Sequence, residues 1–126
     1  MKLRHQLFIL LFLLVVFVPS LQAGTNVSGR YAGGGTNVKI KLSVSAPPPA
    51  AFIVLQQLPS GVQLISANPA PAGASGQQIK WLFKHPRSGG ASISMQLSKP
   101  VAVNQLRGEV RFQHPKNGKM FSQRIK

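Results

Sequence analysis

Alternation of apolar and polar residues dominates the chain after residue 23. From Val38 to Ser45, valine, isoleucine and leucine occupy every second position, and lysine and serine occupy the positions between them. This alternation predicts a β-strand with one face in the core and one face in water. The same period of two recurs over Ile79–Lys84, Ala91–Ser98 and Glu109–Gln113. We therefore expect several half-buried strands.

Further strands are predicted from shorter patterns. Ala51–Leu55 is continuously apolar, which is typical of a more deeply buried strand. Val62–Ser66 and Lys119–Ile125 are shorter candidates, and Val27–Tyr31 is a weak first strand.

Turn-forming residues separate these segments. Pro47–Pro49 blocks the strand before it, and Pro115–Gly118 contains an Asn-Gly pair suited to a tight turn. Asn68–Gly76 is rich in proline and glycine and is expected to hold no regular structure. No helical period of useful length appears after residue 23. Seven or eight short strands over about 100 residues predict an all-β protein, an Ig-like antiparallel β-sandwich.

The first residues have the pattern of a secretory signal peptide. Lys2 and Arg4 precede an apolar run from Leu7 to Val18, and Leu21-Gln22-Ala23 is an acceptable cleavage site. The run reaches about 18 Å along a helix, less than the roughly 30 Å of a bilayer core, so cleavage is favoured over a retained anchor. We expect a signal peptide at 1–23, a flexible lead-in or edge strand at 24–35, and the sandwich domain at 36–126. Export without cysteine points to a secreted or periplasmic bacterial protein.

The order of the segments resembles that of the Ig-like repeat modules of bacterial surface and secreted proteins. The resemblance covers Val38 to about Val103. It rests on a Leu-Pro-x-Gly-Val phrase after a strand, followed by a strand with a central tryptophan. Those modules often carry an aspartate before the phrase, where this chain has Gln56 and Gln57, so no calcium-linked role is carried over. The resemblance implies a structural or adhesive module, and cohesin-type sandwiches share its outline. The signature residues are Leu58, Pro59, Gly61, Val62 and Trp81.

Composition removes most kinds of chemistry. The chain has no cysteine and a single acidic residue, Glu109. Thiolate zinc sites, thiol nucleophiles, carboxylate pairs and Asp-oriented triads are therefore excluded. The histidines after residue 23 are His85 and His114, and each precedes a proline at the end of a predicted strand. A turn explains these histidines better than a metal site, so we expect no enzymatic activity, no metal and no cofactor.

Positive charge is the one feature of the sequence with functional weight. The chain has 15 lysines and arginines and a formal net charge of +14. Such a charge attracts polymers rich in phosphate or carboxylate, with an affinity that falls as salt rises. The alternative is a solvated surface that keeps the protein soluble and blocks edge-to-edge pairing of strands. The candidate polyanion-binding residues are Lys39, Lys41, Lys80, Lys84, Arg107, Arg111, Lys116 and Lys119.

These patterns predict an exported, non-enzymatic module with a structural, adhesive or protein-binding role at the cell surface or in the periplasm. One alternative is a polyanion-binding protein whose ligand is lipopolysaccharide, a wall polymer or extracellular DNA. Another is a carbohydrate-binding module, for which Trp81 is the best aromatic platform, although core packing competes for that residue. The expected partner is an anionic surface polymer or a protein at a sheet edge. A further alternative is a small accessory subunit that completes the sheet of another protein by strand addition. We expect neither sequence-specific nucleic-acid binding nor a second membrane span.

Overall fold

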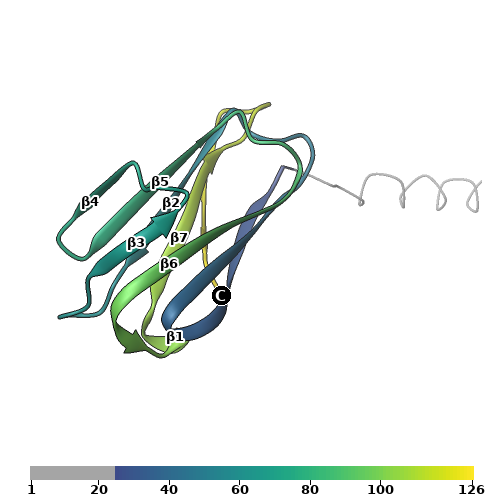
Figure 1. The fold of residues 1–126 in the computed structure, drawn as a ribbon. Coiled ribbons are helices and arrows are strands. Elements are labelled where there is room, and N and C mark those ends of the chain that lie inside the picture. The colour runs from purple at the N-terminus through teal and green to yellow at the C-terminus, as the bar shows by residue number, and fades with distance from the viewer. Residues whose placement is uncertain (1–24) are drawn as a thin grey trace, which may run out of the picture.

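The computed structural model describes residues 25–126, and these residues form two sheets packed face to face (Figure 1). The elements are β1 (Val27–Val44), β2 (Ala51–Gln57), β3 (Leu64–Asn68), β4 (Gly73–Ser75), β5 (Gln78–Lys84), β6 (Gly89–Val101), the short 3-10 turn η2 (Val103–Gln105), β7 (Arg107–Gln113) and β8 (Met120–Arg124). One sheet has the order β1-β6-β3, and the other has the order β4-β5-β2-β7-β8. The prediction of an all-β sandwich is confirmed, and the predicted signal peptide lies outside the described residues.

Two details of the strand prediction are wrong. The loop at 68–76 was expected to hold no regular structure, yet Gly73–Ser75 forms β4 and pairs with Gln78–Lys80. Sheet pairing uses backbone amide and carbonyl groups, so three small residues beside a regular strand are sufficient. The strand expected at Val62–Ser66 begins instead at Leu64 and ends at Asn68.

Alternating side chains from both sheets meet in one apolar core. Every second residue of β1 from Val38 to Val44 is buried, and the residues between them are exposed. The opposite sheet contributes Phe52, Trp81 and Phe112, each at most 2% exposed. Both faces of the sandwich are therefore formed by the remaining, outward side chains. Within residues 25–126, no helix is long and apolar enough to cross a membrane.

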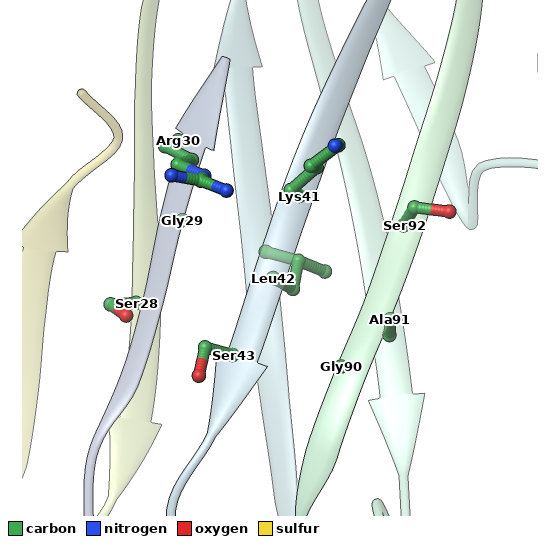
Figure 2. A pocket seen from close by; sticks show the side chains of 9 residues that line it. All are labelled: Ser28, Gly29, Arg30, Lys41, Leu42, Ser43, Gly90, Ala91 and Ser92. Carbon is green, nitrogen blue, oxygen red and sulfur yellow. The ribbon is translucent and has the colours of Figure 1, made fainter. Parts of the chain in front are cut away.

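The 18 residues of β1 do not run in one direction. Gly33 and Gly35 have φ angles of 79° and 68°, a region that favours glycine, and the chain turns back on itself there. Ser28–Arg30 consequently lies beside Lys41–Ser43 and runs opposite to it (Figure 2). The second half of β1 pairs with β6. The first half of β1 therefore adds a segment at the edge of this sheet. These residues belong to the segment 24–35, for which the sequence predicts a flexible lead-in or an edge strand.

The last residue of the chain joins the first half of β1 to the other sheet. The amide of Lys126 donates to the carbonyl of Gly29 at 3.1 Å, and the amide of Tyr31 donates to the carbonyl of Lys126 at 2.7 Å. The neighbouring amide of Ile125 donates to the carbonyl of Gly108 on β7 at 2.9 Å. One side of the sandwich is thus closed by backbone hydrogen bonds.

A buried polar group lies next to this closure. Gln56 is fully buried and faces the core from the end of β2. Its Oε1 accepts a hydrogen bond of 2.6 Å from the Tyr31 hydroxyl, and its Nε2 donates to the carbonyls of Gln57 and Arg107. Gly108 is the register partner of Gln56 on β7, and its missing side chain leaves the space that the amide and phenol fill. The buried amide is therefore fully satisfied.

Candidate functional site

Every cation after residue 24 is exposed. The 13 lysines and arginines of the described residues all lie on the surface. The structure does not bring the eight candidate polyanion-binding residues into one patch, because the strands that carry them belong to different sheets. They divide between the outer face of the five-stranded sheet, the outer face of the three-stranded sheet and the β7–β8 turn.

The outer face of the five-stranded sheet carries the larger group of cations. Lys80 and Lys84 lie on β5, and Arg107 and Arg111 lie on β7, with β2 between the two strands. Register extends this group to Arg124 on β8, which pairs with Glu109. Sequence reasoning missed Arg124 as a member of the group, since only the β7–β8 pairing places it there.

An apolar strip crosses the same face between the cations. This apolar strip consists of Ile53 and Leu55 on β2 and Leu82 on β5. Ile53 pairs with Leu82 on one side and with Arg111 on the other, so these three side chains form one row across the sheet. Ile53 and Leu55 are half-buried, and Leu82 is 42% exposed. The expectation that Ala51–Leu55 is buried more deeply holds for its inward residues and is wrong for these two.

The single carboxylate is neutralised locally. Glu109 forms an ion pair with Arg111, and the Ser122 hydroxyl donates a hydrogen bond of 2.7 Å to its Oε2. The hydrogen bond from Ser122 is the main reason why the pKa of Glu109 is below its usual value, and Arg111 adds to the effect. In the described residues this is the one ion pair, so Lys80, Lys84, Arg107 and Arg124 face solvent without an acidic partner.

The outer face of the three-stranded sheet is basic and polar. Lys39 and Lys41 project from it, and the amides and hydroxyls of Asn68, Ser94 and Gln96 line the same broad hollow of about 770 Å³. A second hollow of about 670 Å³ lies over the two halves of β1, where Arg30 and Lys41 project from neighbouring segments (Figure 2). This face has cations and hydrogen-bonding groups, and the one large apolar residue of its strands that is exposed is Ile65 on β3, at 60%.

The β7–β8 turn holds the remaining predicted cations. Lys116 and Lys119 are exposed there, next to Met120, which is 63% exposed, and Phe121, which is 42% exposed. Phe121 stacks on Phe112 with ring centroids 5.5 Å apart, so one side of its ring is covered.

Both histidines of residues 25–126 lie at strand ends, His85 after β5 and His114 after β7. His85 has a φ of 49°, and its amide donates to the carbonyl of Ala50. His114 accepts a hydrogen bond at Nδ1 from the amide of Lys116, as a turn residue does. Residues 25–126 contain no group of three His, Cys, Asp or Glu side chains that could hold a metal ion.

The signature residues of the Leu-Pro-x-Gly-Val phrase are structural in this fold. Leu58 and Val62 are buried in the core, and Gly61 has a φ of 80° that its turn requires. Trp81 is 1% exposed, and its Nε1 donates a hydrogen bond of 2.9 Å to the carbonyl of Pro69. A buried indole cannot stack on a sugar, so the carbohydrate-binding alternative loses its best residue.

Comparison with known proteins shows no family for this chain. No family model matches it, and no curated protein matches it. Among solved structures it is similar to ACE19, the collagen-binding subdomain of the Enterococcus faecalis surface protein ACE. The two chains are 12% identical with a TM-score of 0.44, over 82% of this chain and 94% of that chain. What this chain binds therefore has to be inferred from its own residues.

Proposed function

We propose that the protein is an exported, non-enzymatic Ig-like module that binds anionic polymers or surfaces outside the cytoplasm. The observation that carries the proposal is the uniform exposure of its cations: 13 lysines and arginines lie on the surface of residues 25–126, against one carboxylate that is already paired. Such a surface has a positive potential over both faces, which attracts anionic ligands and concentrates them at the protein.

The proposed location rests on the amino-terminal sequence. The basic start, the apolar run and the small residue at Ala23 are typical of a signal peptide. The polymers that such a protein meets on export are lipopolysaccharide, anionic wall polymers, anionic lipid and extracellular DNA. An adhesive or structural role at the cell surface or in the periplasm is compatible with binding any of these.

Contact with a protein through a sheet edge receives less support from the geometry. Three of the four edge strands are short: β3 and β8 have five residues each and β4 has three, and β3 also has a register irregularity against β6. The fourth edge, the first half of β1, is already hydrogen-bonded to Lys126 at Gly29 and Tyr31. Short or irregular edges offer a poor template for an added strand. The binding of anions therefore becomes the first candidate function.

Retention on heparin resin and on immobilised lipopolysaccharide, measured across a salt series, tests the proposal. Residues 24–126 should stay bound well above physiological salt, and replacing Lys39, Lys41, Lys80 and Lys84 by glutamate should abolish retention. The matched control replaces the same four residues by arginine and keeps the charge, so it should elute with the original protein. Elution of the unaltered protein at or below physiological salt would refute the proposal and indicate that the basic surface serves solubility.

A further inference from the structure

We propose that the outer face of the five-stranded sheet docks on the surface of a bilayer that contains anionic phospholipid. This inference rests on the proposed function, and it assigns that function a face of the protein and a chemical class of partner. The face places cations without an acidic partner next to exposed or half-buried apolar side chains in neighbouring rows across one sheet.

The register of the sheet arranges these features in order. Leu55 lies between Lys80 on β5 and Glu109 on β7, and Ile53 lies between Leu82 and Arg111. Ile53 and Leu55 thus follow the middle of the face on β2, and Leu82 extends the apolar strip onto β5 between the two lysines. The arginines of β7 and β8 lie on the other side of β2. Met120 adds a further apolar side chain, 63% exposed, at the β8 end of the same face.

The cations specify the charge of the partner. Lys80, Lys84, Arg107 and Arg124 have no acidic partner within the described residues, and they project from the same face of one sheet. Arg107 and Arg124 also line a hollow of about 250 Å³ on this face, together with Leu55 and the paired carboxylate Glu109. Phosphate groups at a membrane surface match this arrangement over its whole width.

The apolar strip distinguishes a bilayer from a soluble polyanion. Heparin, DNA and wall polymers offer charge along a hydrated chain and gain nothing from Leu82 or Met120. A bilayer interface offers phosphates and, just beneath them, acyl chains that accept apolar side chains. The row Leu82–Ile53 would then leave water while the neighbouring lysines and arginines stay at the level of the phosphates.

The opposite face supplies a matched comparison. Lys39 and Lys41 also project from one strand, two residues apart, and both are exposed. Their neighbours are serine, asparagine and glutamine side chains, without a large exposed apolar residue among the lining of that hollow. Neutralising Lys39 and Lys41 therefore lowers the net charge by the same amount as neutralising Lys80 and Lys84. The two changes differ only in the face of the protein that loses its cations.

Sedimentation of residues 24–126 with vesicles of phosphatidylglycerol and phosphatidylcholine tests the inference. Each cation held near an anionic surface raises partitioning about five-fold, so Lys80→Gln with Lys84→Gln should lower binding about 25-fold. Lys39→Gln with Lys41→Gln should lower it by less than about three-fold, since those cations act only over a distance. Leu82→Thr keeps a strand-forming residue and should lower vesicle binding about five-fold, because the exposed part of the leucine no longer leaves water.

The same variants on heparin resin separate the inference from the function on which it rests. Leu82→Thr should leave heparin elution unchanged while weakening vesicle binding. Equal losses from the two lysine pairs, or vesicle binding that is insensitive to Leu82→Thr, would overturn the assignment of this face to a bilayer. Retention on heparin without vesicle binding would also overturn it and would leave the proposed function standing with a soluble polyanion as ligand. If the unaltered protein binds neither heparin nor vesicles, the proposed function itself is refuted. Thermal unfolding of each variant, compared with the original protein, identifies any loss that comes from misfolding.

Discussion

Replacing Gly108 by alanine tests how tightly the sandwich closes around the hydrogen bond between Tyr31 and Gln56. A methyl group at this position would lie 2.5 Å from the Tyr31 hydroxyl, 2.8 Å from Gln56 Oε1 and 2.8 Å from Ile125 Cδ1. Atoms in native proteins do not approach a Cβ this closely. The substitution therefore forces the phenol, the amide or the β7–β8 hairpin to move.

The expected cost follows from these contacts. Overpacking of a well-filled interior costs about 1–3 kcal/mol, and we expect the upper end because three atoms must move at once. Alanine also has less conformational freedom than glycine in the unfolded chain, which offsets about 0.4–1 kcal/mol of this loss in the free energy of unfolding. The net loss of roughly 2 kcal/mol corresponds to a decrease in melting temperature of about 8–16 °C for a domain of this size.

Chemical denaturation and thermal melting measure the change, and the chain offers a matched control. Gly73 on β4 has nothing within 4 Å of its would-be Cβ and no positive φ, so Gly73→Ala should be neutral or slightly stabilising. Tyr31→Phe removes the closest atom, so the cost of Gly108→Ala should be smaller in that background, with a coupling of about 0.5–3 kcal/mol. Equal stability of Gly108→Ala and Gly73→Ala, or strict additivity with Tyr31→Phe, would refute the reasoning.

Two further predictions concern single aromatic residues. Tyr31 is the one tyrosine, and burial raises its pKa to about 12, so the absorbance of tyrosinate should appear near that pH in the folded protein and near 10 after unfolding. Because the folded-state pKa is the higher one, the stability that comes from the protonated phenol is complete below about pH 10 and is lost as the pH rises towards 12, a decline that Tyr31→Phe should reduce. An ordinary pKa in the folded state would contradict the burial of this phenol. Trp81 is the one tryptophan, so the fluorescence of the folded protein should be blue-shifted and resist quenching by acrylamide; Trp81→Phe, which leaves the Pro69 carbonyl without its donor, should cost about 2–4 kcal/mol in denaturation. Ready quenching would show that the indole is accessible and would restore the carbohydrate alternative.

The alternation of apolar and polar residues predicted much of the fold, because successive side chains of a strand point alternately to the core and to solvent. It predicted that Val38 and Ile40 face inward while Lys39 and Lys41 face water, and the burial of β1 agrees. Applied to β2, where Phe52 and Val54 face inward, the same period places Gln56, the residue after Leu55, on the inner face as well. Sequence reasoning stopped at Leu55, where the apolar run ends, and so missed the buried amide.

Arrangements that depend on pairing between distant segments could not be predicted from local sequence patterns. β4 exists because Lys80 and its neighbours offer backbone partners, which no local pattern in Gly73–Ser75 reveals. The segment 24–35 was expected to be a flexible lead-in or an edge strand, and its pattern did not reveal that Gly33 and Gly35 form the turn at which β1 reverses.

The candidate site shows the same limit. Each cation was identified from its own strand, but strand order decides which cations are neighbours. Lys80 and Lys84 are brought into one surface with Arg107 and Arg111 by β2 between them, and Lys39 and Lys41 are left on the opposite side. The apolar strip could have been suspected from Leu82, since it stands between two lysines on the outward side of an alternating strand.

The hydrogen bonds of Lys126 with Gly29 and Tyr31 bear on how the protein folds in time. The reversal of β1 involves residues that are near in sequence, so that hairpin can form within microseconds. Its outer edge pairs with Lys126, which is far from it in sequence, and the side chains of Asn26 and Gln123, which are also hydrogen-bonded to each other, are 97 positions apart. Contacts of such separation are slow to form, and folding of β-sandwiches therefore extends to milliseconds or seconds. Because Ile125 also lies against the space at Gly108 that Tyr31 and Gln56 fill, the docking of residues 125 and 126 completes the surroundings of this hydrogen bond.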